Sequence, residues 1–192
     1  MKFFVSLLSL AILVSCQDIK GNLEVSKNLT LQSQNGAEQI IEGKYSGSVK
    51  FTKKKMVLTL DQMGDSEFTF KIPKGTDIPD NGTISLSADE VGQPYDVSGV
   101  VATKITRGDI EESWESCTYQ QPYTVCRTDA RGNRTCWTEY RTVFGRQYVR
   151  YYMETVDKDF NMSLLDAGDS VAVFAGKDIA RYRRDIYSDQ CR

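Results

Sequence analysis

Hydrophobic and polar residues alternate over several short segments of the chain, as they do in half-buried β-strands. The alternation is clearest over 67–72, where every second residue is aromatic or aliphatic, and it recurs over 48–52 and more loosely over 56–60. A run rich in β-branched residues over 97–105 also favours a strand. Turn-forming sequences such as Asn81-Gly82 separate these segments. The pattern predicts an all-β protein, built as an antiparallel sandwich or a small barrel.

The C-terminal half contains a segment, 126–136, whose turn chemistry predicts a hairpin. Asp129 begins the turn and Gly132 suits the left-handed position of a three-residue loop. Counting outward from that loop places Cys126 opposite Cys136 in a non-hydrogen-bonded pair, with Cα atoms about 4.5 Å apart, which a disulfide accepts. We therefore predict a Cys126–Cys136 disulfide and, from the remaining cysteines, Cys117–Cys191. A Cys117–Cys126 bridge is the main alternative.

The last apolar residues leave two structures open. Ile179, Tyr182 and Ile186 fall at helical spacing, so a short C-terminal helix over 178–187 competes with a strand.

Length and composition suit one globular domain. The chain has 192 residues, of which 40% are hydrophobic, and we expect a single all-β domain over 43–192. Lysine dominates the first half of the chain, whereas arginine and tyrosine gather in the second, which suggests a subdomain boundary near 110. The net charge of −2 gives no basic excess for nucleic acid. The absence of histidine excludes Ser-His-Asp and Cys-His catalysis and histidine-ligated metals.

The N-terminus has the features of an export signal. Lys2 precedes an apolar run over 3–14 that is too short to span a bilayer as a helix. The run ends in Leu13-Val14-Ser15-Cys16, which resembles the lipobox of bacterial lipoproteins over these first residues only. The resemblance implies a signal peptide over 1–15, removed before a lipidated Cys16 that anchors the protein in the membrane.

Residues 16–42 are mostly polar, and we expect them to form the lipid anchor and a polar tether that can include one strand. With Cys16 lipidated, four cysteines remain, an even number that suits two disulfides in an exported protein. Gln17 stands where an aspartate would resemble an inner-membrane retention signal, so the sequence favours the outer membrane of a bacterial envelope.

Sites for catalysis or metals are weak in this sequence. The cysteines lack the close spacing of zinc ligands. The segment 157–161 begins like a calcium loop but lacks the glycine and the final glutamate that such loops need. Glu111, Glu112 and Glu115 could supply paired carboxylates for hydrolysis of sugars. A strand would send the adjacent Glu111 and Glu112 to opposite faces, so these two do not form a pair. We predict no catalytic residue, metal or cofactor.

One segment suggests a binding surface. Along a strand, Arg146, Tyr148, Arg150 and Tyr152 share one face. Tyrosine and arginine dominate binding hot spots, and guanidinium groups suit carboxylates and phosphates. We therefore expect a lipid-anchored envelope protein with a binding or structural role, whose partner is a glycan, a lipid headgroup or another protein. An envelope polymer hydrolase using carboxylates and a scaffold subunit with an exposed apolar patch are the alternatives.

Overall fold

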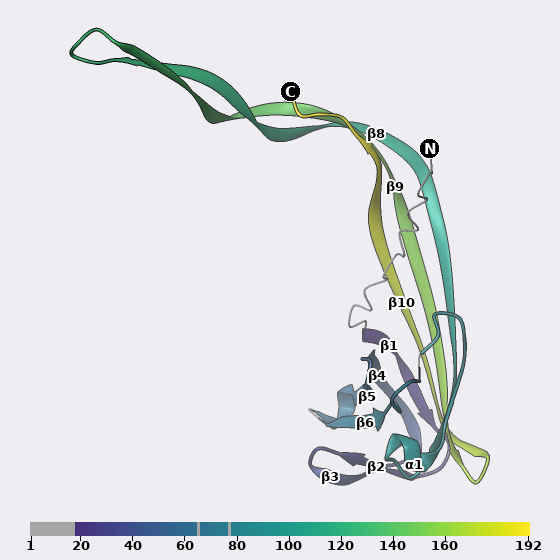
Figure 1. Ribbon diagram of the computed structural model, residues 1–192. Helices are drawn as coiled ribbons and strands as arrows, with labels where there is room; N and C mark the ends of the chain where they lie inside the picture. Colours follow the sequence, from purple (N-terminus) through teal and green to yellow (C-terminus); the bar gives the residue numbers. More distant parts are fainter. Residues whose placement is uncertain (1–17, 65, 77) are drawn as a thin grey trace, which may run out of the picture. The chain divides into compact units, whose positions relative to one another are not determined.

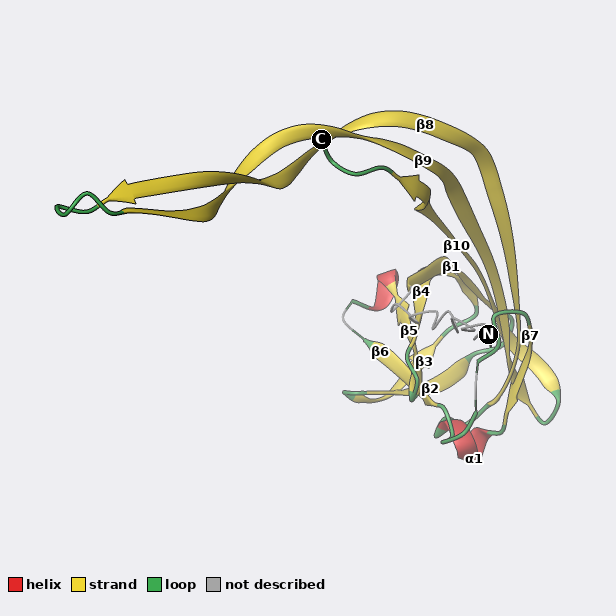
Figure 2. Cartoon of the chain, turned by 45° about the horizontal axis from the view of Figure 1, so that its top comes forward, coloured by secondary structure: helices red, strands yellow, loops and turns green. Residues whose placement is uncertain are grey.

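A computed structural model describes residues 18–64, 66–76 and 78–192 (Figure 1). The predicted signal peptide and Cys16 lie outside these residues. The described chain is all-β, as predicted: Figure 2 shows strands and loops with two very short helices, and neither helix is long and apolar enough to cross a membrane. The elements are β1 (Asp18–Val25), β2 (Leu29–Ser33), β3 (Gly36–Ile40), β4 (Gly43–Phe51), β5 (Lys55–Leu60), η1 (Asp61–Met63), β6 (Glu67–Lys71), β7 (Gly82–Leu86), α1 (Ala88–Val91), β8 (Asp96–Thr128), β9 (Arg134–Asp166) and β10 (Asp169–Ser188).

All ten strands belong to one antiparallel sheet, in the order β3-β2-β6-β5-β4-β1-β10-β9-β8-β7. The prediction of a sandwich or a small barrel is therefore wrong, because the sheet is single and open, with β3 and β7 at its ends. The alternating pattern identified the strands, but it carries no information about which strand pairs with which.

The chain divides into two compact units. Unit 1 contains the residues up to Lys104 together with Asp157–Ile179, and unit 2 contains Ile105–Val156 together with Ala180–Arg192. The chain passes from one unit to the other within β8, β9 and β10. The composition shift near 110 lies close to the first of these passages.

Unit 1 holds the hydrophobic core. Its strands send alternate residues inward, as expected for 67–72, where Phe68, Phe70 and Ile72 are all buried. Aromatic rings from neighbouring strands meet in this core: Phe160 of β9 packs edge-on against Phe51 of β4 and tilted against Phe174 of β10.

The expectation of a polar tether over 16–42 is wrong for its described residues, because 18–40 form β1, β2 and β3. β1 lies inside the sheet, paired with β4 on one side and β10 on the other. Its buried residues Ile19, Leu23 and Val25 belong to the core. Their signal in the sequence is weak because Gly21 stands at the remaining inward position.

Glycines allow neighbouring strands to approach closely at the centre of this sheet. Gly21 of β1 pairs with Gly47 of β4 and with Gly176 of β10. A Cβ atom at Gly47 would lie 2.2 Å from the carbonyl oxygen of Thr59, and one at Gly21 would lie 2.2 Å from that of Ala175. No side chain fits at either position without a backbone shift.

A buried glutamine side chain completes the contact between β2 and β6, which share the single register pair Ser33↔Phe68. Gln93, which follows α1, accepts a hydrogen bond from the Gln32 amide through Oε1 (2.8 Å). Its Nε2 donates to the carbonyl oxygens of Gln32 and Thr69, each at 2.8 Å. The amide group thus replaces main-chain bonds that the two strands do not make with each other.

The segment 178–187, for which the sequence left a helix and a strand open, lies within β10, so the helix is wrong and the strand is confirmed. β10 is neighbour to β9 along the sheet, and its side chains contact those of β9 at several points. The spacing of apolar residues within 178–187, which suggested a helix, contains no information about a partner strand as distant in sequence as β9.

Candidate binding face

The hairpin of unit 2 has the predicted turn. The Asp129 amide donates to the Asn133 carbonyl and the Gly132 amide donates to the Asp129 carbonyl, both at 3.0 Å. Gly132 has a φ of 82°, the left-handed conformation expected of it. The carboxylate of Asp129 accepts bonds from Arg131 and Asn133, and those from Asn133 are the main cause of its lowered pKa.

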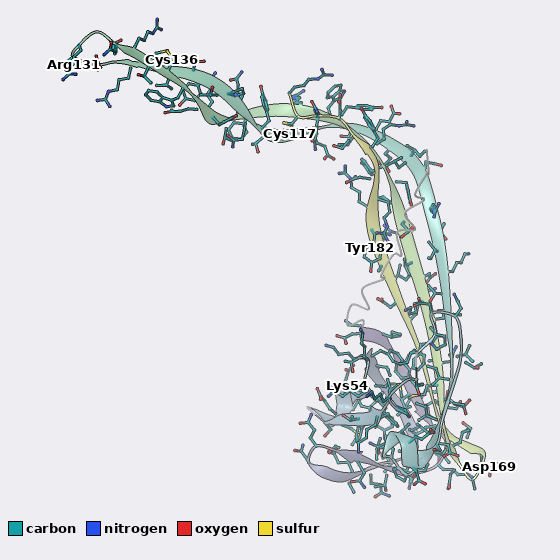
Figure 3. The ribbon with its side chains drawn as sticks, viewed as in Figure 1. Lys54, Cys117, Arg131, Cys136, Asp169 and Tyr182 are labelled. Carbon is teal, nitrogen blue, oxygen red and sulfur yellow. A yellow bond between two sulfur atoms is a disulfide. The ribbon has the colours of Figure 1, made fainter. Side chains whose placement is uncertain are left out.

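Both predicted disulfides are present. Cys126–Cys136 joins β8 to β9 beside the turn, with Cα atoms 4.1 Å apart, and Figure 3 shows Cys136 next to Arg131 of the loop. Cys117–Cys191 ties the C-terminal tail to β8 across 74 residues of sequence.

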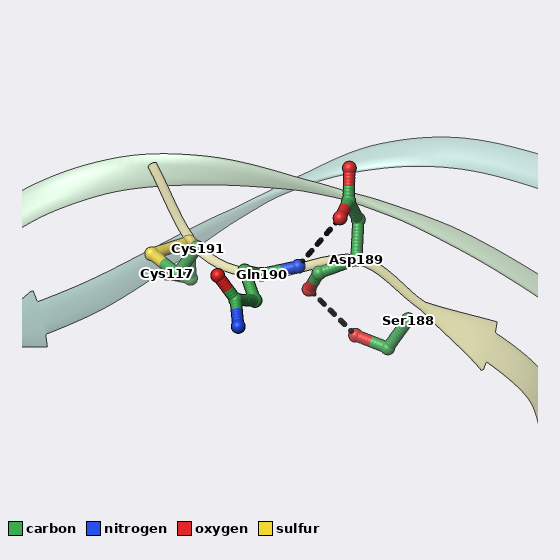
Figure 4. Close-up of a disulfide and its surroundings, with 5 residues drawn as sticks. All are labelled: Cys117, Ser188, Asp189, Gln190 and Cys191. Carbon is green, nitrogen blue, oxygen red and sulfur yellow. Dashed lines mark hydrogen bonds between the residues drawn. A yellow bond between two sulfur atoms is a disulfide. The ribbon is translucent and has the colours of Figure 1, made fainter.

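Gly145 on β9 leaves space for this second disulfide, and Figure 4 shows how the disulfide joins Cys191 of the tail to Cys117. A Cβ atom at Gly145 would lie 3.2 Å from Cys191 Sγ and 2.9 Å from the Arg192 carbonyl oxygen. Just beyond it, Arg146 and Arg192 exchange main-chain hydrogen bonds, so the tail extends the sheet by one further pair. The glycine therefore fixes where the tail crosses β9.

β8 and β9 keep the same register from the turn as far as Glu111 and Tyr151. Side chains that touch across β8 and β9 lie at equal distances from Arg131 on the two strands. Such pairs are Cys126 with Cys136, Tyr123 with Glu139, Gln120 with Thr142, Trp114 with Tyr148, Glu112 with Arg150, and Glu111 with Tyr151. Residues two or four apart on either strand therefore share a face.

Three of the four predicted ligand residues contact neighbours on their face. The Tyr148 ring lies 5.5 Å from that of Trp114 and 6.4 Å from that of Tyr187. Its hydroxyl is hydrogen bonded to Glu112, which raises the pKa of the phenol. Tyr152 lies under the guanidinium of Arg107, 5.5 Å from the ring centre.

The two arginines of the predicted face differ. Arg150 Nε lies 3.2 Å from Glu112 Oε1, an ion-pair distance, but makes no hydrogen bond there. Arg146 is exposed and uses its main chain to pair with Arg192. Arg150 is therefore committed to an internal contact, whereas Arg146 presents its guanidinium to solvent.

Three further aromatic residues, which the sequence pattern did not place on this face, extend it. Trp114 contacts Tyr148, and Tyr140 and Phe144 precede Tyr148 at intervals of four residues on β9. Trp114 is 65% exposed, Tyr140 66% and Phe144 85%. Counting back from the predicted hairpin in steps of two would have found them. We call Trp114, Tyr140, Phe144, Tyr148 and Tyr152, with Arg146 and Arg150 between them, the aromatic face.

The opposite face is held together by polar contacts. The Tyr151 hydroxyl donates to Glu111 at 2.8 Å, which is the main cause of the raised pKa of this tyrosine. The Arg183 guanidinium of β10 stacks on the Tyr151 ring at 3.9 Å and binds Glu115 of β8 and Asp185. This cluster links all three long strands.

Unit 2 depends on such contacts because it buries few apolar side chains. Among its described residues, Val149 is the one buried aliphatic residue. Glu154 is also buried and accepts hydrogen bonds from Arg184 Nε (2.9 Å) and Nη2 (2.8 Å). The aromatic side chains of the face are thus not needed to fill a core.

The carboxylates considered for hydrolysis of sugars bind other side chains of unit 2. Glu111 and Glu112 lie on opposite faces, as predicted, bound to Tyr151 and to Arg150 respectively. The segment that begins like a calcium loop lies in β9, and its Asp157 and Asp159 flank Lys177 Nζ at 2.8 and 3.8 Å. Within the described chain, no group of three metal-ligating side chains comes together.

Comparison of the chain with protein-family models, with curated proteins and with solved structures found no match in any of the three.

Proposed function

We propose that this protein is anchored by lipid at Cys16 in a bacterial cell envelope, most simply the outer membrane, and that it binds an envelope ligand through the aromatic face. The lipobox-like N-terminus supports the anchor. The two disulfides support export to an oxidising compartment. Its role is binding, with unit 1 as the folded support and unit 2 as the recognition element.

The spacing of the rings carries this proposal and favours an extended glycan as the ligand. Tyr140, Phe144 and Tyr148 follow one another at four-residue intervals, about 13 Å along a strand. The opposite strand carries small polar residues, Ser116 and Thr118, so a long, flat ligand can lie along the rings.

A positive charge on the aromatic face indicates which class of glycan it would bind. The exposed Arg146 stands between Phe144 and Tyr148 on the same face. A guanidinium binds carboxylates and phosphates with two parallel hydrogen bonds, so the face suits a glycan that carries anionic groups.

Sedimentation with purified peptidoglycan sacculi, an anionic envelope glycan, tests this function. The variant Trp114→Ser/Tyr140→Ser/Phe144→Ser should bind at least about tenfold more weakly than the wild type, a loss of about 1.4 kcal/mol. A matched control removes three exposed apolar residues of unit 1, as Ile41→Ser/Val100→Ser/Val173→Ser, and should bind normally. No binding by the wild type, or equal loss in both variants, would contradict the glycan proposal.

A second function, scaffold subunit of an envelope complex, is favoured by the exposure of Phe144 and Trp114. Monomeric proteins seldom expose large contiguous apolar patches, and the cores of protein interfaces are enriched in aromatic residues and arginine. Under this alternative the aromatic face would cross-link to a protein in intact envelopes, and the chain would not bind peptidoglycan sacculi.

The anchor is tested separately by intact mass of the membrane-extracted protein. We expect the mass of residues 16–192 plus acyl chains, with four thiols that alkylate only after reduction. An unlipidated mass would contradict the envelope anchor without affecting the aromatic face.

A further inference from the structure

Two neighbouring turns of unit 1 gather lysine side chains. The first turn, 52–55, connects β4 to β5, and the second turn, 73–76, follows β6. The Ile72 amide, just before the second turn, donates to the Lys54 carbonyl oxygen in the first (2.8 Å), so the two turns lie side by side. The lysines at these turns and at the strand ends beside them form what we call the lysine cluster: Lys53, Lys54, Lys55, Lys71 and Lys74.

Hydrogen bonds hold the main chain of both turns. The amide and the hydroxyl of Thr52 donate to the Lys55 carbonyl oxygen at 2.9 and 3.0 Å, and the Thr52 hydroxyl oxygen accepts from the Lys55 amide at 3.1 Å. In the second turn the Thr76 amide donates to the Pro73 carbonyl oxygen (3.1 Å), and Gly75 has the left-handed conformation, with a φ of 92°. The lysines between these bonds are exposed and extend from a fixed main chain.

Two lysines of the cluster face each other directly. Lys55 of β5 is the register partner of Lys71 of β6. The adjacent residues Met56 and Phe70 are buried in the core, so both lysines point away from the core on the same face of the sheet. Like charges at directly opposite positions destabilise a sheet. This pair therefore does not serve the stability of unit 1.

The cluster has no carboxylate partner within the described chain. Other lysines of unit 1 form ion pairs, namely Lys44 with Glu24, Lys50 with Asp18, Lys158 with Asp80, and Lys177 with Asp157. No described carboxylate lies within ion-pair distance of a lysine in the cluster. The two turns therefore present a concentrated positive charge, which suits an anionic partner.

The position of the cluster indicates which anionic partner it meets. Asp18, the first described residue, is the register partner of Lys50, and the first lysine turn begins two residues later at Thr52. Cys16 precedes Asp18 by two residues, so the Cα atoms of these two residues can lie no more than about 7 Å apart. An anchor at Cys16 would therefore hold this end of β1 close to the bilayer, next to the lysine turns.

We propose that the lysine cluster binds the anionic lipid headgroups of the bilayer that holds the acylated Cys16. This inference rests on the proposed anchor and adds a second contact to it. Each lysine near an anionic membrane surface strengthens binding, within a Debye length of about 8 Å at physiological ionic strength. An acyl anchor alone leaves the protein free to rotate, whereas the second contact fixes which side of unit 1 faces the membrane.

Lysine labelling of the acylated protein in lipid vesicles tests the proposal. The protein extracted from the membrane is reconstituted into vesicles of phosphatidylcholine alone, or of phosphatidylcholine mixed equally with phosphatidylglycerol, which is anionic. An amine-reactive ester then labels accessible lysines, which peptide mass spectrometry identifies. The lysines of the cluster should react at least about fivefold more slowly in the anionic vesicles, and raised salt should reduce this difference. Lys27, an exposed lysine beyond the other end of β1, is the internal control and should react equally in both.

The variant Lys53→Gln/Lys54→Gln/Lys74→Gln tests the charge of the cluster directly. All three side chains lie at exposed turn positions, so the variant should fold with an unchanged circular dichroism spectrum. Removal of three positive charges should return the labelling rates of Lys55 and Lys71 in anionic vesicles to their rates in neutral vesicles. Binding to peptidoglycan sacculi, which we assign to the aromatic face, should stay unchanged.

A matched control, Lys27→Gln/Lys44→Gln/Lys104→Gln, removes the same charge from exposed lysines outside the cluster and should keep the protection. Equal labelling of the cluster in both kinds of vesicle, or equal protection of Lys27, would overturn the proposal. Cross-linking of a photoreactive side chain at position 54 to a protein instead of a lipid in intact envelopes would overturn it too. An unacylated intact mass would refute the anchor and the docking together, whereas an acylated protein with unprotected lysines would refute the docking alone.

Discussion

Replacing Gln93 by leucine should destabilise unit 1 by about 3 kcal/mol. The glutamine is buried and its amide makes three hydrogen bonds to the main chains of β2 and β6. Leucine has a similar volume, so the change removes the bonds and leaves little cavity.

The magnitude follows from the groups left behind. The Gln32 amide and the carbonyls of Gln32 and Thr69 lose their partners, and each unsatisfied group costs about 2 kcal/mol. The three groups together therefore cost about 6 kcal/mol. Burial of the leucine side chain offsets about 3 kcal/mol of this cost. β2 and β6 share a single register pair, so the sheet offers the freed groups no replacement.

Urea unfolding followed by circular dichroism, together with amide exchange of 29–33, measures the effect. Tryptophan fluorescence is unsuitable, since Trp114 and Trp137 both belong to unit 2. Gln39→Leu, at an exposed position of β3, is the matched control and should change stability by less than about 0.5 kcal/mol. Equal stability of the Gln93 and Gln39 variants would refute the role assigned to Gln93.

A charged replacement gives the same position a pH dependence. In Gln93→Glu, an ionised carboxylate would face two carbonyl oxygens, so its pKa rises above the unfolded value. The free energy of unfolding of this variant should therefore lie closest to the wild-type value below about pH 4, and the difference should grow as pH rises through the folded pKa of the new carboxyl group. A pH-independent deficit would contradict this geometry.

Three further predictions concern other parts of the fold. Gly145→Val should block the Cys117–Cys191 disulfide, so that mass spectrometry after alkylation without reduction finds two free thiols while the other bridge stays closed. Gly47→Ala should lower the unfolding free energy by about 3 kcal/mol, because the new methyl group meets a main-chain oxygen; an unchanged urea midpoint would contradict this. Tyr151 should ionise above its ordinary pKa of 10.0 because its hydroxyl donates to Glu111. Absorbance titration should show that Tyr151→Phe lacks one of the tyrosine ionisations that the wild type shows above pH 10. The contribution of this hydrogen bond to the free energy of unfolding should be present below pH 10 and disappear as pH rises through the folded pKa of Tyr151.

Features set by nearby residues were predictable from the sequence. The hairpin around Gly132 follows from turn chemistry within a few residues, and that turn fixes the register that brings Cys126 opposite Cys136. The same local alternation identified the buried strand over 67–72.

Features set by distant partners were not predictable. β1 owes its place to β4 and β10, and Gly21 interrupts its apolar pattern at the point of closest approach. The segment 178–187 is a strand because β9 lies beside it, although its apolar spacing fits a helix equally well. Gln93 showed no signal, since a buried glutamine cannot be told from an exposed one without its partners.

The candidate surface lies between these cases. Alternation grouped Arg146, Tyr148, Arg150 and Tyr152 on β9, but the neighbouring strand decides which of them are engaged. Glu112 engages Arg150 and Tyr148, while Phe144 on the same face stays exposed. Only the pairing of β8 with β9 shows where the accessible rings lie.

Photo-cross-linking in intact bacterial envelopes tests most directly whether the aromatic face binds a ligand. A photoreactive side chain would replace Phe144 in the full chain and, as the control, Ile41 of unit 1, which is also exposed and apolar. We expect a defined adduct from position 144, with a glycan if the main proposal holds and with a protein if the alternative holds, and no adduct from position 41. No adduct from 144, or the same adducts from both positions, would contradict it.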